Sequence, residues 1–138
     1  MVRILVAEDN PGDVLLLREA LRHSQVACEL IVAEDGEKAF QLLEKAASLA
    51  QSSRPDLIVL DVNLPKRSGK DVLRWVRSKP ELAAIPVVLL TSSASPDDKA
   101  EAMLLGANLY VQKSSNLDEV LKLGPTMENL LRDKADKL

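Results

Sequence analysis

Short apolar runs alternate with longer amphipathic segments along the whole chain. Each run is almost continuously apolar, which is the pattern of a strand buried on both faces of a parallel sheet. The segments between them repeat apolar residues at helical spacing, and the first begins with Asn10 and Pro11, which favour a helix start. The pattern predicts strands at 2–7, 28–33, 56–61, 86–91 and 109–113, and helices at 10–21, 35–50, 68–78, 95–106 and 116–134.

Five strand–helix units in strict alternation predict an α/β fold with a five-stranded parallel sheet and helices on both of its faces. The runs that begin at Val2, Asp56 and Pro86 are the most apolar and should form the central strands. The runs at 28–33 and 109–113 carry more polar residues and should lie at the edges. This distribution suits the flavodoxin-like strand order 2-1-3-4-5. We expect one domain over residues 1–138, with a frayed tail at about 133–138.

A glycine and a proline at 124–125 interrupt the last amphipathic segment. Proline inside a helix removes a backbone hydrogen bond and clashes with the preceding turn, at a cost of about 3 kcal/mol. We therefore expect a kink or a break in the fifth helix. Gly106, in contrast, lies where the fourth helix should end, and glycine suits that C-terminal position.

Composition and charge narrow the class of protein. The 138 residues are 46% apolar and 28% charged, as in ordinary globular domains. The formal net charge of −3 argues against a nucleic-acid-binding surface, and no apolar run is long enough to span a membrane. Cys28 is the only cysteine, so no internal disulfide can form, and the first residues lack the pattern of a signal peptide. The expected location is the cytoplasm.

Chemically capable side chains stand where the predicted strands end. Glu8 and Asp9 follow the first strand, and Asp61 ends the third. Thr91 ends the fourth strand and Lys113 the fifth. Ligands of such sheets bind at the carboxyl ends of the strands, beside the point where the strand order reverses. Three carboxylates crowded there repel one another unless a cation shares them, and a small set of oxygen ligands suits Mg²⁺. The lysine and the threonine hydroxyl would then face a further anion, such as a phosphoryl group.

The segments EDN, LDVNLPKRSG, LLTSSA and YVQK, in this order, resemble the response regulator receiver domains of two-component signalling, over residues 1 to about 131. The resemblance implies that Asp61 is the phosphoacceptor. It implies that Asp9 binds Mg²⁺ directly, that Glu8 assists through water, and that the backbone carbonyl of Asn63 is a further ligand. The remaining implied roles are phosphoryl binding by Thr91 and Lys113, switching by Thr91 and Tyr110, and tuning of dephosphorylation by Asn63 and Ser93.

The resemblance also implies partners. The phosphoryl donor would be a sensor histidine kinase. The segments QKSSNL and EDNPGDVLLLREAL, together with a long second helix, are similar to single-domain receivers that partner bacterial phytochromes. Such a protein is not an enzyme beyond its own phosphotransfer and dephosphorylation, and it signals by protein contact or by relaying the phosphoryl group. A homodimer is expected through the fourth helix, fifth strand and fifth helix, where Lys99, Glu101, Asp118, Lys122 and Glu128 offer both signs of charge.

Two alternatives to a phosphoacceptor stay open. The domain could be a pseudo-receiver that binds a partner without phosphorylation. The acidic residues could be helix caps, although capping explains neither Asp61 nor Lys113.

The segment SGKD at 68–71 lacks the residues of a phosphate-binding P-loop, and Asn63 replaces the second aspartate of haloacid-dehalogenase phosphatases. Ser114 follows Lys113 where receivers usually have proline, so the geometry of that peptide bond stays open.

Overall fold

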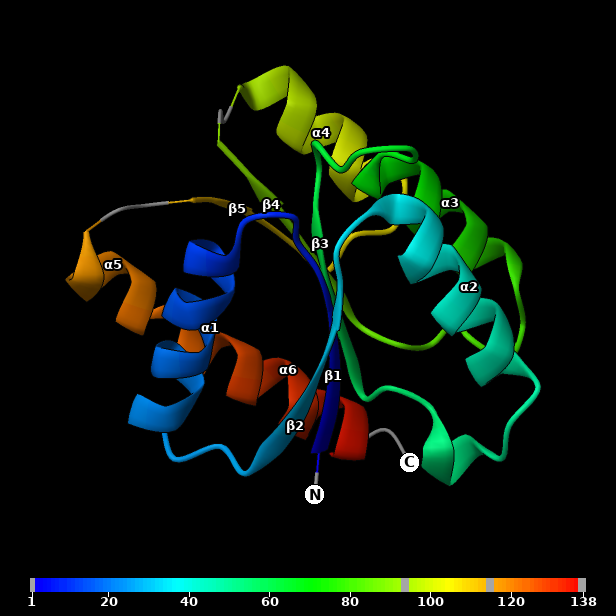
Figure 1. Cartoon of the computed structure of the whole chain (residues 1–138), viewed down its shortest axis with the longest axis horizontal. Coiled ribbons are helices and arrows are strands. Elements are labelled where there is room, and N and C mark those ends of the chain that lie inside the picture. The colour runs from blue at the N-terminus through cyan, green and yellow to red at the C-terminus, as the bar shows by residue number, and fades with distance from the viewer. Residues whose placement is uncertain (1, 93–94, 114–115, 137–138) are drawn as a thin grey trace.

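The computed structural model describes residues 2–92, 95–113 and 116–136 of the chain. Strands and helices alternate as predicted (Figure 1). Their bounds differ from the predicted ones by at most three residues. A short 3₁₀ turn, η1 (Gln51–Ser53), follows the second helix. The elements are β1 (Val2–Ala7), α1 (Pro11–His23), β2 (Cys28–Ala33), α2 (Gly36–Ala47), β3 (Leu57–Asp61), α3 (Gly69–Ser78), β4 (Val87–Thr91), α4 (Pro96–Leu104), β5 (Leu109–Gln112), α5 (Leu117–Leu121) and α6 (Leu123–Asp136).

The five strands form one parallel sheet in the order β2-β1-β3-β4-β5. This is the flavodoxin-like order predicted from the sequence, so that prediction is confirmed. All residues of β3 and β4 are buried, whereas the edge strands β2 and β5 are mostly half-buried. The polarity of each apolar run therefore identified its place in the sheet correctly.

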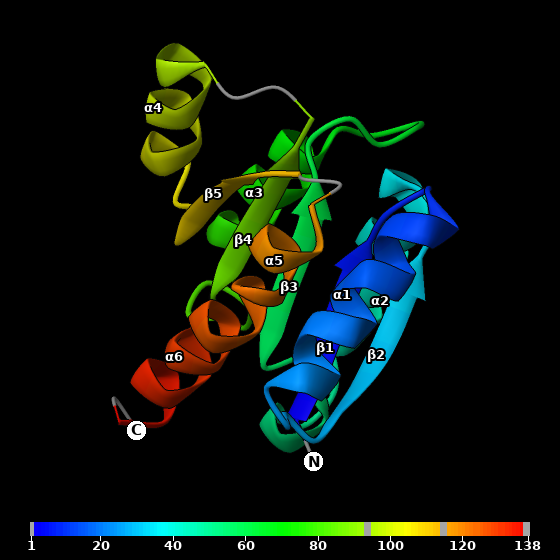
Figure 2. The same ribbon diagram turned by 90° about the vertical axis from the view of Figure 1, so that its left-hand side faces the viewer.

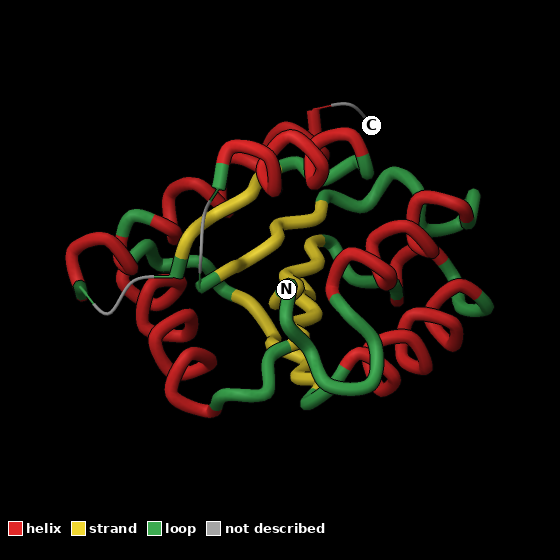
Figure 3. The backbone as a smooth tube through the Cα atoms, turned by 90° about the horizontal axis from the view of Figure 1, so that it is seen from above, coloured by secondary structure: helices red, strands yellow, loops and turns green. Residues whose placement is uncertain are grey.

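Helices cover both faces of the sheet, as predicted. One core cluster joins the sheet to α2, α3 and α4 through residues such as Leu43, Leu73 and Ala102. The other joins the opposite face to α1 and α6 through Leu17, Leu21 and Met127. Seen from above, the helices stand on either side of the strands (Figure 3). The two clusters fix the sheet from both sides, so the carboxyl ends of its strands are held at one end of the molecule.

Side-chain caps start the helices that follow the strands. The side chain of Asn10 accepts a hydrogen bond from the backbone N–H of Gly12, and Asp35 caps α2 through Lys38 N. Ser68 and Ser95 cap α3 and α4 in the same way. Each cap satisfies a backbone donor that the first helical turn leaves without a partner, which fixes the end of the preceding loop.

The predicted break in the fifth helix is present. α5 ends at Leu121 and α6 begins at Leu123 (Figure 2). Pro125 therefore lies in the first turn of α6, where its missing N–H does little harm. Gly124 packs against the end of α1: an added Cβ would lie 2.2 Å from Ser24 Oγ and 2.4 Å from the carbonyl oxygen of Ala20. The glycine–proline pair therefore both redirects the chain and lets α6 approach α1.

The end of α4 and the C-terminal end of the chain were also predicted from the sequence. Gly106 follows α4 with a φ of 101°, the left-handed conformation that suits a helix-ending glycine. α6 runs to Asp136, while fraying of the tail stays a prediction. In the described part of the chain, no helix combines the length and apolar character needed to cross a membrane.

Candidate functional site

Three carboxylates meet at the carboxyl end of the sheet. β1 and β3 are neighbours, with Ala7 paired to Leu60, so Glu8 and Asp9 follow directly beside Asp61. Glu8 and Asp61 are only 3% and 4% exposed, whereas Asp9 is exposed. One oxygen from each carboxylate lies within 4.8 Å of the others. The structure thus brings together the three acidic residues that the sequence placed at strand ends.

Lys113 neutralises part of this charge. It follows β5, where its backbone N–H donates to the carbonyl oxygen of Thr91, and its side chain reaches over the end of the sheet. Its ammonium Nζ lies 2.8 Å from Asp61 Oδ2 and 2.8 Å from Glu8 Oε2. Asp13 Oδ2, on α1, lies 3.0 Å from the same nitrogen. One lysine therefore contacts three carboxylates.

Sequence reasoning missed the contact made by Asp13. The sequence pattern identifies that residue only as an acidic residue suited to the positive start of α1, where it does stand. Its position one turn into the helix turns its side chain toward Lys113, which lies 100 residues away in the sequence. No local sequence pattern indicates this contact, because it depends on how α1 packs on the sheet.

Local backbone contacts orient Asp61. Its Oδ1 accepts a hydrogen bond of 3.0 Å from the backbone N–H of Asn63, while Oδ2 accepts one from Lys113. Gly69 packs against the backbone of Asp61: a Cβ added to Gly69 would lie 2.3 Å from the carbonyl oxygen of Asp61. The glycine of the LDVNLPKRSG segment is thus required for α3 to start this close to the end of β3.

Burial and neighbouring charges shift two pKa values. Burial raises the pKa of Glu8 most strongly, the Lys113 ammonium lowers it, and the charge of Asp61 raises it again, which leaves it at about 7 instead of 4.5. Burial acts to lower the pKa of Lys113, but its contacts with Asp61, Glu8 and Asp13 outweigh burial and raise that pKa. The protein alone therefore holds an excess of negative charge that a single lysine does not balance.

The donor set fits a hard divalent cation. Its side-chain ligands are all carboxylate oxygens, as Mg²⁺ prefers. Glu8 Oε2 is buried, and the Lys113 ammonium that lies 2.8 Å from it is shared with Asp61 and Asp13. Buried carboxylates that share a single ammonium are only partly neutralised, and a cation between Glu8, Asp9 and Asp61 would lower that cost.

An open cavity of about 640 Å³ adjoins the acidic residues. Glu8 and Asp9 line one side of it, and Leu15 and Val32 line another, together with Pro11, Val14, Glu34, Asp35 and Pro65. Leu15 is 63% exposed. Glu8 and Asp9 can therefore be approached from solvent on this side, whereas Asp61 does not line the cavity.

The remaining site residues lie around this centre. Thr91 is 3% exposed at the end of β4, the strand between β3 and β5. Tyr110, on β5, is half-buried against the core cluster beneath α2, α3 and α4. Asn63 is exposed in the loop after β3. Ser93, and Ser114 with its bond to Lys113, lie outside the described residues.

The chain is similar to known signalling proteins over most of its length. The response regulator receiver domain family matches residues 4–123. Response regulator Rcp1 of Synechocystis sp. is 40% identical over 126 residues, which cover 91% of this chain and 86% of Rcp1. The crystal structure of the phosphorylated cyanobacterial phytochrome response regulator RcpA is 39% identical with a TM-score of 0.81, over 94% of this chain and 93% of RcpA. The Mn²⁺-bound structure of Rcp1 is 37% identical with a TM-score of 0.79, over 93% of this chain and 92% of that one.

Glu8→Gln should stabilise the metal-free protein at about pH 8. The Glu8 carboxyl has an ordinary pKa of 4.5 and a folded pKa of about 7, so the folded state binds more protons between these values. Stability is therefore lost as the pH rises through this window, by up to about 3 kcal/mol. We expect a gain of about 2 kcal/mol in the free energy of unfolding at about pH 8, and almost none at about pH 4, by urea denaturation in EDTA.

The matched control is Glu44→Gln, at an exposed glutamate of α2, which should change stability little at either pH. Added Mg²⁺ should stabilise the wild type more than Glu8→Gln, because the variant lacks one carboxylate of the acidic cluster that would attract the cation. A Glu8→Gln protein that is less stable than the wild type at about pH 8 in EDTA would contradict this view of the site.

Proposed function

The chain belongs to the response regulator receiver domain family, and we propose that it is a phosphoacceptor which receives a phosphoryl group on Asp61 from a sensor histidine kinase. The observation that carries the proposal is the buried Asp61 carboxylate at the end of β3, beside Glu8 and Asp9 and 2.8 Å from Lys113 Nζ. Helix capping accounts for none of these contacts. The family is a signalling family, and the chemistry proposed is limited to the domain's own phosphotransfer and dephosphorylation.

The proposed reaction is a displacement at phosphorus. A carboxylate oxygen of Asp61 forms a bond to phosphorus while the bond between phosphorus and the donor's histidine nitrogen breaks. The electron pair of that bond stays on the imidazole, which takes up a proton. The Asn63 N–H and Lys113 hold the two Asp61 oxygens, so the nucleophile is oriented before the donor arrives. In such transfers, positioning and charge neutralisation provide most of the catalysis.

Glu8, Asp9, Asp61 and the backbone carbonyl of Asn63 are the residues that we propose to hold Mg²⁺. The three clustered carboxylates, which share only the Lys113 ammonium, support this assignment, and a relative has been crystallised in an Mn²⁺-bound form. When bound, the cation would neutralise charge on the carboxylates and on the phosphoryl oxygens. Lys113, no longer the only cation in the cluster, would then be available to contact those oxygens.

Thr91 and Tyr110 are the proposed switch. Thr91 ends the strand beside Asp61, and its hydroxyl would bind a phosphoryl oxygen. Tyr110 lies on β5, where it pairs with Leu89 of β4, and it packs against the core. A shift of Thr91 toward the phosphoryl group would leave space that Tyr110 can enter, which repacks the face formed by α4 and β5. Receivers of this kind convert a local contact into a surface change through two discrete packings.

The proposed partner is a sensor histidine kinase in the cytoplasm, and the similarity to a cyanobacterial phytochrome response regulator favours a phytochrome kinase. For the output surface we propose a homodimer through α4, β5 and the predicted fifth helix, which the structure divides into α5 and α6. Three of the five charges named for this surface are already paired within the chain: Glu101 with Lys70, Lys122 with Glu119 and Glu128 with Arg132. The better support is Leu104 at the end of α4, which is 89% exposed, beside Met103 at 46%.

Asp61 should be phosphorylated by acetyl phosphate in a Mg²⁺-dependent reaction. Mass spectrometry of the intact protein should show one added phosphate, which is lost in EDTA and in Asp61→Asn. Asp71→Asn, at an exposed aspartate of α3, is the matched control and should be labelled as the wild type is. Undiminished labelling of Asp61→Asn would refute the assignment, and absence of any labelling would favour a pseudo-receiver.

Asn63 and Ser93 should set the lifetime of the acyl phosphate. Each stands two residues after a residue that would contact the phosphoryl group, Asp61 and Thr91. A bulky side chain there obstructs the attacking water, so Asn63→Tyr and Ser93→Tyr should lengthen the half-life by about fivefold, equivalent to about 1 kcal/mol of barrier. Decay of the labelled protein measures this, with Arg74→Tyr as an exposed control. Unchanged half-lives in both variants would remove the role.

Beryllofluoride with Mg²⁺ should increase the fraction of dimer at micromolar concentration. The phosphoryl mimic would favour the packing in which the face formed by α4, β5, α5 and α6 is complementary to itself. Sedimentation velocity measures the fraction, and Leu104→Ser should reduce it while Leu15→Ser, at an exposed leucine of α1, should not. A wild type that stays monomeric with and without the mimic would refute the dimer.

A further inference from the structure

The loop that follows Asp61 is fastened to the start of α2 by contacts that the proposed reaction does not use. The Pro65 carbonyl oxygen accepts hydrogen bonds from Gly36 N at 3.0 Å and from Arg67 N at 2.8 Å. Lys66 Nζ lies 3.6 Å from Asp35, the N-cap of α2. Gly36 leaves no room for a side chain, because an added Cβ would lie 2.0 Å from the Arg67 carbonyl oxygen.

This fastening holds a strained turn. Lys66 has a φ of 69°, and the hydrogen bond from Arg67 N to the Pro65 carbonyl closes around it. A non-glycine residue with this φ costs free energy, and such turns persist only where the surroundings over-determine them. The turn begins two residues after Asn63, whose backbone N–H orients Asp61. A change at the turn therefore has a short path to the site.

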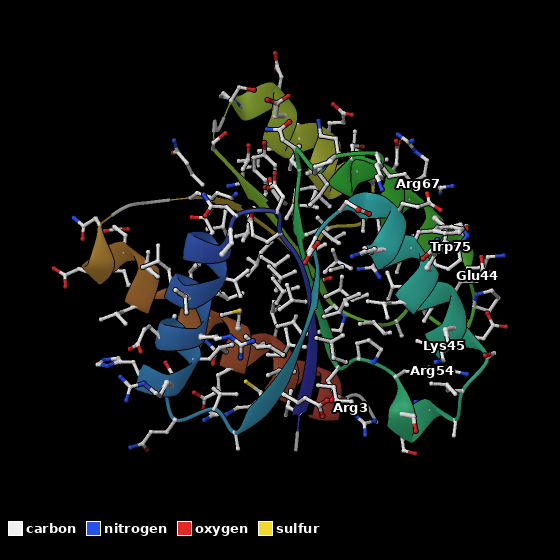
Figure 4. The ribbon with its side chains drawn as sticks, in the orientation of Figure 1. Arg3, Glu44, Lys45, Arg54, Arg67 and Trp75 are labelled. Carbon is white, nitrogen blue, oxygen red and sulfur yellow. The ribbon has the colours of Figure 1, made fainter. Side chains whose placement is uncertain are left out.

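Arg67 makes the side-chain part of the fastening. Its Nε donates a 3.0 Å hydrogen bond to Glu37 on α2, and its guanidinium lies 4.1 Å from the centre of the Phe40 ring. Phe40 in turn packs on Trp75 of α3, with ring centres 4.5 Å apart. Arg67 and Trp75 lie on the side of the molecule formed by α2 and α3 (Figure 4). Arg67, Phe40 and Trp75 thus form a continuous stack from the loop to this face.

We propose that Arg67 is a positioning residue: it fixes the loop that carries Asn63 and transmits the occupancy of the Asp61 site to Phe40 and Trp75 on the α2–α3 face. The inference rests on the proposed function, because it takes the Asn63 carbonyl as a metal ligand. Residues that hold metal ligands in place typically change metal affinity by tenfold or more when mutated. Because Arg67 acts through four residues of backbone, the expected effect is smaller.

Arg67→Lys tests the proposal without changing the charge near the acidic cluster. A lysine cannot reproduce the planar contact with Phe40 or the geometry of the bond to Glu37. We expect the affinity for Mg²⁺, measured by calorimetry, to fall about threefold to tenfold. Arg74→Lys is the matched control, since Arg74 is exposed on α3 and pairs with Asp71. Its Mg²⁺ affinity should equal that of the wild type.

Trp75 supplies a readout that a purely structural role would not move, because it is the only tryptophan in the chain. Titration with Mg²⁺ should change its emission in the wild type in parallel with the calorimetric signal. In Arg67→Lys, saturation with Mg²⁺ should produce a smaller change, while urea denaturation in EDTA shows a folded protein. Equal affinity and equal emission change in the variant and wild type would overturn the inference alone. A wild type that binds no Mg²⁺ would overturn the proposed function, and this inference with it.

Discussion

The constraint that organises this molecule is the burial of like charges at the end of a parallel sheet. Two carboxylates that are less than 5% exposed, Glu8 and Asp61, share one edge because β1 and β3 are neighbours. In a low-dielectric environment such a pair is unfavourable unless a cation is close. Lys113 supplies one positive charge, and its position depends on β5 being next to β4. The site therefore exists only when the whole strand order is correct.

The apolar pattern and the site are two consequences of the same topology. The central strands are buried on both faces, which leaves their carboxyl ends as the place where polar residues can emerge together. Loops after the strands are then fixed by caps and close packing. The end of β3 is fixed by the start of α3, where Gly69 packs against the Asp61 carbonyl and Ser68 caps the helix. A rigid frame of this kind keeps the carboxylates near one another despite their repulsion.

The sequence predicted what depends on periodicity and position along a strand. Strand order, the acidic cluster, Lys113 at the end of β5 and the break near Pro125 all follow from local patterns or from rules of parallel sheets. The tie between Asp13 and Lys113, and the stack of Arg67 on Phe40, depend on how helices lean on the sheet and on one another. Helix packing angles vary by many degrees for the same apolar pattern, so contacts between distant surface side chains do not follow from spacing. Local sequence likewise does not reveal that Lys66, with an ordinary side chain, adopts a left-handed backbone.

Lys113 and the proposed cation would both neutralise the carboxylates of Glu8 and Asp61. Without a cation, the ammonium neutralises Asp61 and Glu8 and so limits repulsion in the folded state. With the proposed cation among the carboxylates, that demand would fall, and the long, flexible lysine stem would let the ammonium move to the oxygens of an incoming phosphoryl group. Asp13 stands on α1, outside the three-carboxylate cluster, and offers the ammonium a contact that a cation in that cluster would not take. The lysine would thus change its contacts within one small region, which keeps a positive charge beside Asp61 both before and after the nucleophile is used.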